Sequence, residues 1–94
     1  MFVLHVDMQT KPGSEHALEK TFLEIFRPAI SRQDGFRGVE LLRPSEKGDY
    51  RLSIAFDERS LQKKWVASDL HQEVWPQMEA LCGSYAVKYY NSVG

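Results

Sequence analysis

The run Asp34-Gly35-Phe36-Arg37-Gly38-Val39-Glu40-Leu41-Leu42-Arg43-Pro44 marks a corner at which a helix ends and a strand begins. Asp34-Gly35 is a helix stop signal, because glycine readily adopts the left-handed backbone conformation that follows a last helical turn. Residues 36–43 predict a strand, and the polar turn that starts at Pro44 leads into another, Tyr50 to Phe56, in which side chains alternate. The corner therefore predicts a helix followed by two antiparallel strands.

Upstream of this corner the sequence predicts a strand and then a helix. Residues 2–10 alternate apolar with mixed side chains, which is the period of a strand with one apolar face. Lys11-Pro12-Gly13 ends the strand, and Ser14 is placed to cap a helix that runs to about Arg32. Pro28 predicts a kink or an early end in that helix. Its apolar residues at helical spacing form a stripe that we expect to be buried: Leu18, Phe22, Ile25, Phe26, Ala29 and Ile30.

Downstream of the corner the sequence predicts a broken helix and a last strand. Asp57 or Ser60 is expected to cap the first helical piece. Ser68 is expected to cap the second piece, which ends at Cys82-Gly83. The last strand runs from about Ser84 to Asn91 and is rich in aromatic residues, as strands often are.

The break at Ser68 has a geometric consequence for two aromatic side chains. On one continuous helix Trp65 and His71 would point about 120° apart, since each residue turns the helix by roughly 100°. A bend at Ser68 lets both point into one space. His71 and Trp75 follow at helical i, i+4 spacing, and Pro76 is expected to bias the Trp75 backbone away from the helix. The core stripe of the second piece is Leu70, Val74, Met78 and Leu81.

The order of elements predicts a single α+β domain over residues 1–94. A βαββαβ order is that of a ferredoxin-like fold, an antiparallel sheet with both helices on one face. The opposite face is then bare, and its expected residues suit neither water nor a dry core: Val3, His5, Asp7, Ser53, Ala55 and Lys88. A chain this short also buries only about 60 to 65% of its unfolded surface. Both observations predict a homodimer through the sheet face.

Composition excludes several classes of protein. Twelve basic and thirteen acidic side chains give a formal charge of -1, so the chain lacks the basic footprint of a nucleic-acid-binding protein. One cysteine, Cys82, excludes a disulfide framework, and the histidines at positions 5, 16 and 71 lie on different elements, so no metal site is predicted. No apolar run approaches the roughly 18 residues that cross a bilayer. With no leader pattern, we expect a cytoplasmic protein with no membrane partner.

Two motifs carry a resemblance to a known family. The corner at residues 34–44 and the later run Trp65-Val66-Ala67-Ser68-Asp69-Leu70-His71, of the form Trp-x-x-Ser-x-x-His, resemble the antibiotic biosynthesis monooxygenase family. The order and spacing of elements match along essentially the whole chain. The resemblance implies a dimeric α+β barrel, formed by two such sheets with the helices outside. It also implies a substrate pocket between helices and sheet in each subunit.

His71 is the first candidate for chemistry. Its neutral imidazole could accept a proton from a phenolic or enolic substrate, since histidine has an unperturbed pKa near 6.5. The alternative is a structural histidine that caps or hydrogen-bonds at the bend. Trp65 and Trp75 could form aromatic walls that stack on a flat ligand, and the alternative for both is packing between helix and sheet.

The last strand presents further candidates. Tyr85, Tyr89 and Asn91 alternate on one face and could offer hydrogen bonds to a ligand oxygen, or they could serve as packing and a solvated strand end. Val6 and Phe22 complete the expected substrate-binding set. The remaining basic candidates are expected in ion pairs: Arg37, Arg43 and Arg51.

Three functions follow from the resemblance and the residues. The first is a cofactor-independent monooxygenase that acts with O2 on a small aromatic, quinol or phenolic substrate. The second is a heme-binding or heme-degrading monooxygenase, which the residues disfavour. The Asn that the heme-degrading branch carries on its first strand is replaced by Val6, and Val74 or Trp75 stands where its axial His would be, although iron needs a ligand lone pair. The third is a non-catalytic dimeric module that binds a small ligand.

Overall fold

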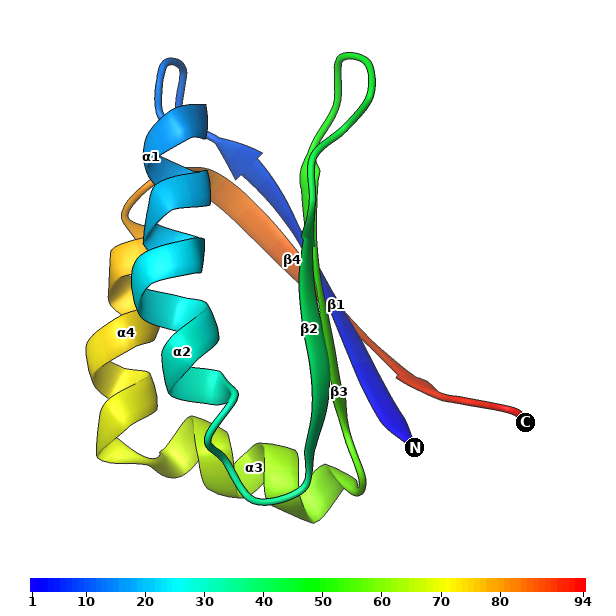
Figure 1. Cartoon of the computed structure of the whole chain (residues 1–94). Coiled ribbons are helices and arrows are strands. Elements are labelled where there is room, and N and C mark those ends of the chain that lie inside the picture. Colours follow the sequence, from blue (N-terminus) through cyan, green and yellow to red (C-terminus); the bar gives the residue numbers. More distant parts are fainter.

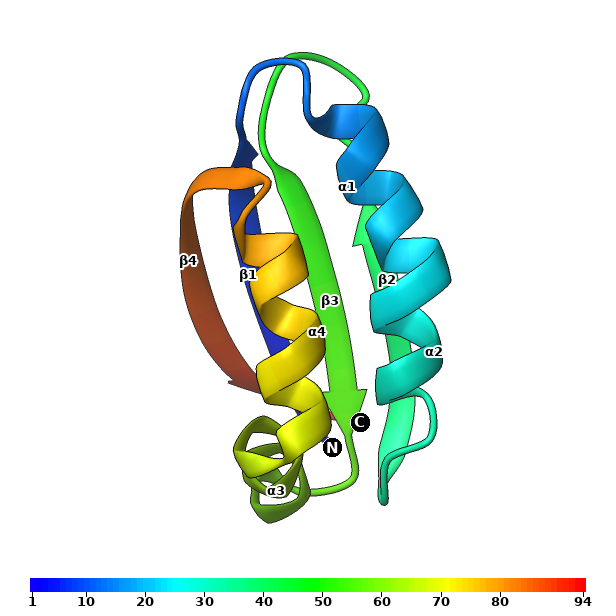
Figure 2. The same cartoon turned by 90° about the vertical axis from the view of Figure 1, so that its left-hand side faces the viewer.

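Four antiparallel strands form one sheet, and the helices lie on one face of it (Figures 1 and 2). The computed structural model describes all 94 residues. The strands are β1 (Phe2–Thr10), β2 (Phe36–Leu42), β3 (Tyr50–Phe56) and β4 (Cys82–Asn91), and their order across the sheet is β2-β3-β1-β4. This arrangement confirms the predicted α+β ferredoxin-like fold.

The helices form two groups over the sheet. The first is a continuous helical rod made of α1 (Glu15–Thr21), the π-helix η1 (Phe22–Phe26) and α2 (Arg27–Ile30). The second is α3 (Arg59–Ala67) and α4 (Asp69–Glu79), which meet at the predicted bend. Figure 2 shows α4 beside the rod, with α3 across the far end of the layer. No helix of the chain is both long and apolar enough to cross a bilayer.

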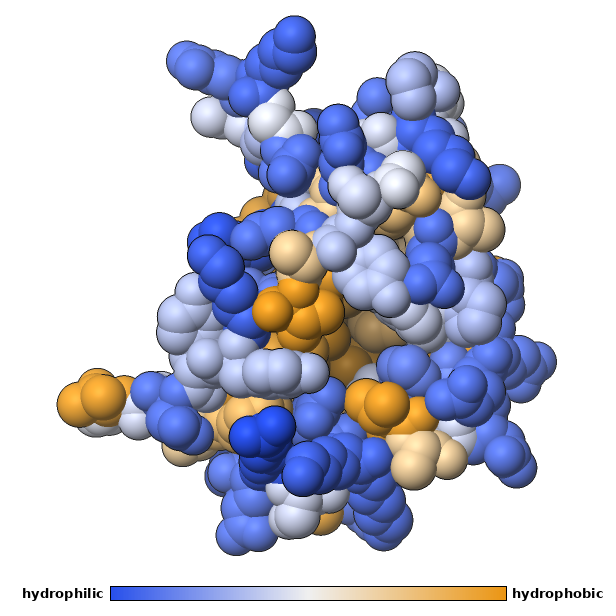
Figure 3. Space-filling view, turned by 180° about the vertical axis from the view of Figure 1, so that it is seen from behind, coloured by the Kyte–Doolittle hydropathy of each residue, from blue (hydrophilic) through white to orange (hydrophobic).

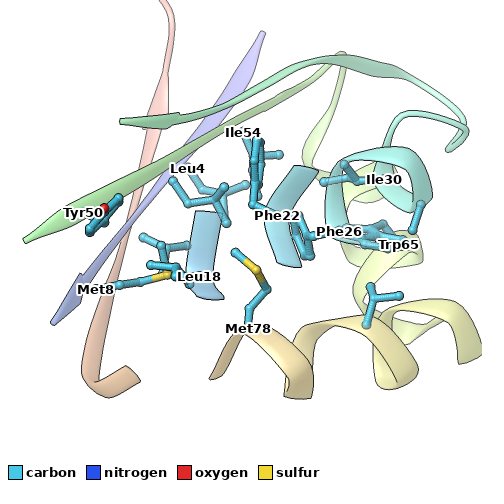
Figure 4. Packing of buried hydrophobic residues seen from close by; sticks show 14 of the residues in the cluster. Leu4, Met8, Leu18, Phe22, Phe26, Ile30, Tyr50, Ile54, Trp65 and Met78 are labelled. Carbon is cyan, nitrogen blue, oxygen red and sulfur yellow. The ribbon is translucent and has the colours of Figure 1, made fainter. Parts of the chain in front are cut away.

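Apolar side chains between the sheet and the helices form one core (Figure 4). The alternation predicted for the two central strands is confirmed, because their buried residues are Phe2, Leu4, Val6 and Met8 on β1 and Tyr50, Leu52, Ile54 and Phe56 on β3. Fully burying one such aliphatic or aromatic side chain contributes about 1.5–3 kcal/mol. The period of the strands therefore places the core on the helix-covered face.

The first helix departs from α-helical spacing. In η1 the backbone N–H of Arg27 donates to the carbonyl oxygen of Phe22, five residues back. Such a turn is wider than an α-helical one, so it rotates Ile25 to the surface while Phe22 and Phe26 stay buried. The expectation that Ile25 belongs to the buried stripe is therefore wrong.

Pro28 explains where this wide turn lies. It is the second residue of α2, directly after the π-helix. Proline has no N–H for the carbonyl of Glu24, four residues back, and the regular ladder is interrupted at this point. The expected kink takes the form of a wide turn without a break. The rod ends at Ile30, slightly before the predicted Arg32.

The predicted helix caps are confirmed in part. Ser14 precedes α1, but its side chain makes no capping hydrogen bond. The expectation that Asp57 or Ser60 caps α3 is wrong, because the N-cap residue is Glu58. The Asp57 carboxylate is engaged elsewhere, in an ion pair with Arg37. The Ser60 hydroxyl lies inside the helix and donates to the Glu58 carboxylate.

The junction of α4 and β4 also differs from the prediction. α4 runs through Pro76 without a break, so the Trp75 backbone stays helical and the expected turn away from the helix does not occur. Packing of the helix's apolar face outweighs one lost backbone hydrogen bond. β4 begins at Cys82 instead of Ser84, and Cys82 pairs with Thr10 beside an irregularity in the β1–β4 register.

Gly35 confirms the stop signal at the helix-to-strand corner. Its φ of 74° lies in the left-handed region, which glycine adopts without strain. A Cβ atom added at Gly35 would lie 2.2 Å from the Leu61 Cδ1 atom. The corner therefore needs glycine twice, for its backbone conformation and for the close approach of α3.

The face of the sheet opposite the helices carries the mixed residues expected from the sequence. On this face the Arg51 guanidinium donates to the Asp7 carboxylate at 2.8 Å, and the His5 ring lies 5.1 Å from the Tyr90 ring. Neighbouring positions Val3, Ser53 and Ala55 are half-buried and Lys88 is exposed. The predicted ion pairs of the three arginines are present: Arg37 with Asp57, Arg43 with Glu19 and Arg51 with Asp7.

Candidate functional site

A pocket opens between the helices and the sheet at the edge formed by β4. Figure 3 shows it as an apolar hollow bordered by hydrophilic surface. It encloses about 590 Å³ of empty space, part of it open to solvent. The floor comes from Leu4, Val6, Leu52 and Ile54, and the walls from Phe26, Gln62, Trp65, Val66, His71, Trp75, Tyr85, Val87 and Tyr89.

The bend at Ser68 brings two of these residues together, as predicted. Ser68 has extended backbone angles, its hydroxyl donates to the Trp65 carbonyl oxygen at 2.6 Å, and it accepts from the His71 backbone N–H at 3.2 Å. One side chain thus ends α3 and caps α4. As a result the Trp65 and His71 rings meet edge to face, with centroids 5.1 Å apart.

The aromatic rings continue from His71 along the pocket. The Trp75 ring is stacked at 6.5 Å from His71 and lies edge to face with Tyr85 at 5.3 Å. Phe26 supports both tryptophans from the core side, with centroids 6.2 Å from each. Edge-to-face and offset pairs at these distances are favourable, so these contacts stabilise the wall.

His71 is the only imidazole in this pocket, and its ring is half-buried. Its Nδ1 atom is buried and has no hydrogen-bond partner. Burial lowers the pKa of His71, because removal from water disfavours the charged imidazolium. The side chain is therefore neutral near pH 7, and one of its two ring nitrogens carries a lone pair that can accept a proton. No cluster of three or more potential metal ligands exists anywhere in the chain.

Five of the residues expected to contact substrate meet at this pocket: Val6, Trp65, Trp75, Tyr85 and Tyr89. Trp65 is only 3% exposed, so most of its ring packs in the core and only part of it lines the pocket. Tyr85 is 42% exposed, and the neighbouring Glu79 carboxylate raises the pKa of the phenol, because a second negative charge beside it is unfavourable. Tyr85 therefore stays protonated and can donate a hydrogen bond.

The other two residues expected to contact substrate, Asn91 and Phe22, lie outside this pocket. Asn91 is at the far end of β4, opposite Phe2, and does not line the pocket. Phe22 lines a separate cavity between the helical rod and β2. There the Glu19 carboxylate accepts from the Arg43 guanidinium and the Tyr50 hydroxyl, which lowers the Glu19 pKa to about 2. That carboxylate is already engaged in three hydrogen bonds, two from Arg43 and one from Tyr50.

Gln62 is a pocket residue that the sequence analysis missed. It is 7% exposed, is the only buried polar residue and lines the pocket. It precedes Trp65 by three residues and so lies on the same face of α3. The three-residue spacing from Trp65 could have predicted that Gln62 faces the pocket, but glutamines on helices are mostly exposed to solvent.

Comparison with known proteins shows the family and the fold of this chain. The family model described as antibiotic biosynthesis monooxygenase matches residues 1–76. A search of curated proteins finds no match. Among solved structures, the chain is similar to a mutant of SnoaB, a cofactor-independent oxygenase from Streptomyces nogalater, with 20% identity over 97% of this chain and 92% of that one and a TM-score of 0.83.

Two other solved structures show the same fold. A putative antibiotic biosynthesis monooxygenase from Nitrosomonas europaea is 14% identical over 100% of both chains, with a TM-score of 0.85. A mutant of MhuD with two manganese protoporphyrin IX bound per active site is 20% identical over 99% of this chain and 95% of that one, with a TM-score of 0.81. At these identities the likeness concerns the fold, whereas the family model matches most of the sequence. The chain belongs to the antibiotic biosynthesis monooxygenase family.

Proposed function

We propose that this protein is a cofactor-independent monooxygenase that acts with O2 on a small aromatic substrate, a quinol or a phenol. The observation that carries the proposal is His71, a half-buried imidazole that lines a pocket walled by aromatic rings and makes no side-chain hydrogen bond within the protein. Family membership supports an oxygenase role, and one protein of this fold is a cofactor-independent oxygenase. Catalysis then needs a base, a dry site and a fixed substrate position.

His71 supplies the base. A neutral imidazole removes a proton from a phenolic or enolic substrate, and the electron-rich anion reduces O2 directly. With an anthrone-like substrate, the methylene carbon loses two hydrogens and becomes a carbonyl that holds one oxygen atom, while the other oxygen leaves as water. The carbon loses four electrons and dioxygen gains four, so no further reductant is needed.

The aromatic walls position the substrate and exclude water. Trp65 and Trp75 offer ring surfaces beside His71, and Val6 lies on the apolar floor beneath them. Tyr85, kept protonated, can donate a hydrogen bond to a substrate oxygen. Holding the substrate in one orientation next to the base lowers the entropic part of the barrier.

Oxygen uptake tests this function directly. The protein, treated with EDTA and given an anthrone-like phenol, is expected to consume one O2 per substrate oxidised and to do so faster than the substrate alone. Flavin and nicotinamide should add nothing. If calorimetry shows that the compound binds while oxygen uptake stays at the uncatalysed rate, the protein is a non-catalytic small-ligand-binding module.

A heme site of the kind implied for the heme-degrading branch does not fit these residues. Val74 is buried in the core, and Trp75, which lines the pocket, has no lone pair for iron. His71 lies a helical turn before the position of the axial ligand. We therefore propose no step through heme.

Hemin titration gives a separate prediction. Followed at the Soret band, it is expected to show no tight 1:1 complex with a histidine-ligated spectrum, because no imidazole stands where the axial ligand would be. A tight complex that His71→Ala abolishes would overturn this prediction and make heme the ligand of the pocket. Bovine serum albumin, which binds hemin, serves as the positive control for the titration.

The homodimer through the open sheet face is a further part of the proposal. The half-buried mixed residues on that face, with an unpartnered buried Nδ1 atom on His5, suit cover by a second sheet better than bulk water. Light scattering at micromolar concentration is expected to give about twice the chain mass of 10.9 kDa. A stable monomer under these conditions would contradict the prediction.

A further inference from the structure

A second groove adjoins the aromatic pocket between α3 and β4. The two cavities share the lining residues Gln62, Val66 and Tyr89, and the groove, with about 670 Å³ of empty space, also touches Arg59 and Lys63. Figure 3 shows hydrophilic surface directly beside the apolar hollow. A ligand that fills the pocket therefore has a neighbouring space lined by two cations.

Arg59 is held in place without its charge being neutralised. Its guanidinium carbon lies 5.2 Å from the Tyr89 ring centroid and 5.7 Å from that of Phe2, two rings that stack on each other. Contact with aromatic faces orients a guanidinium but leaves its N–H groups able to donate. The salt bridges of the chain use other basic residues, namely Arg37, Arg43, Arg51 and Lys64. Arg59 and Lys63 have no carboxylate partner.

Gln62 stands at the junction of the two cavities. It lines both of them and is the only buried polar residue of the chain. Its amide carries hydrogen-bond donors and an acceptor. Its position suits a ligand with an oxygen atom at the border between an apolar body and a charged end.

We propose that the substrate is an aromatic carboxylate, with its ring system in the pocket beside His71 and its carboxylate in the groove beside Arg59 and Lys63. The Gln62 amide lies between the two parts. This inference rests on the proposed function, because it takes the pocket to hold an aromatic ring. A planar carboxylate matches the fork of a guanidinium, through paired charge-assisted hydrogen bonds.

A matched pair of probes tests the carboxylate. 2-Naphthoate and 2-naphthamide have the same ring and nearly the same size, and only the first is charged. Titration calorimetry in low salt is expected to show about 5- to 10-fold tighter binding of 2-naphthoate, as for one or two exposed charge contacts. In 0.5 M NaCl the preference should shrink, because salt screens exposed charges.

Variants of the groove residues test whether the groove causes the tighter binding of 2-naphthoate. The double variant Arg59→Gln/Lys63→Gln should bring the ratio of the two affinities close to one, and Arg59→Lys should retain most of it. Arg37→Gln, which removes a cation already paired with Asp57, should leave the ratio unchanged. Using the ratio cancels any general loosening of the pocket, since both probes share the ring.

The binding results distinguish the carboxylate proposal from the proposed oxygenase function. Equal binding of the two probes, or a preference that survives the double variant, overturns the carboxylate and leaves the aromatic pocket standing. Failure of both probes to bind overturns the aromatic pocket and the carboxylate with it. Oxygen uptake reports on catalysis independently of either result.

Discussion

Replacing His71 with alanine is expected to lower the turnover of an anthrone-like phenol by about 10² to 10⁴-fold, the usual contribution of a general base. The fold should survive. The hydrogen bond from the His71 backbone N–H to the Ser68 hydroxyl is retained in the variant. The His71 ring makes no side-chain hydrogen bond that would be lost. The measurement is the rate of oxygen uptake at saturating substrate, with circular dichroism to confirm that the variant is folded.

The pH dependence of the wild-type rate is a second readout of the same group. Burial lowers the His71 pKa, so the ring stays neutral at pH 7 and becomes protonated only below its ordinary value of 6.5. Turnover should therefore be level near neutrality and fall as the pH drops through that lowered pKa. The acid limb should disappear in His71→Ala.

Trp65→Phe is the matched control for the base. It keeps an aromatic wall beside His71 but removes contact area, so it should raise KM more than it lowers kcat. If His71→Ala turns substrate over at the wild-type rate, the histidine is structural. Deprotonation would then come from the substrate's own ionisation or from a tyrosine.

Phe26→Ala is expected to reduce the free energy of unfolding by about 3–5 kcal/mol, as for other fully buried phenylalanines. Phe26 is 1% exposed and its ring meets the edges of both Trp65 and Trp75. A small domain has only about 5–15 kcal/mol in total, so the loss is a large fraction of its stability. Urea denaturation followed by tryptophan fluorescence measures it.

Leu23→Ala is the control for this variant. Leu23 lies in the same π-helix and is 48% exposed, so its truncation removes little buried surface and should change stability by less than about 0.5 kcal/mol. Equal losses in the two variants would mean that the cost arises from the helix backbone. A loss below about 1 kcal/mol in Phe26→Ala would mean that the core closes around the space.

Local signals were sufficient to predict the elements themselves. Alternation over residues 2–10 and 50–56 predicted both central strands, Gly35 predicted the corner, and Ser68 predicted the bend. Each of these signals acts within a few residues. The strands depend on side-chain alternation, the corner on the backbone freedom of glycine, and the bend on a short side chain that caps a helix. Prediction was weakest at Ile25, because the π-turn that exposes it depends on how the whole rod packs.

Only those residues of the site whose positions depend on such local signals could be predicted from the sequence. Trp65 and His71 share a pocket because one bend turns both toward the sheet, which their spacing around Ser68 already indicated. Asn91 has the expected alternation on β4 but lies too far along the strand to line the pocket. Side-chain alternation predicts which face of a strand a residue occupies, but it does not predict how far along the strand a pocket extends. Phe22 is buried as expected, yet it faces a different cavity.

What the sequence by itself determined is the layering of this protein. The number and order of strands and helices, the apolar face of each and the mixed open face of the sheet all follow from residue patterns that act over one or two turns. What only the tertiary structure decided is which side chains from different elements meet. Gln62 at the junction of two cavities and Arg59 between two rings depend on the distance and rotation of α3 relative to β4, and close packing among residues far apart in sequence sets both.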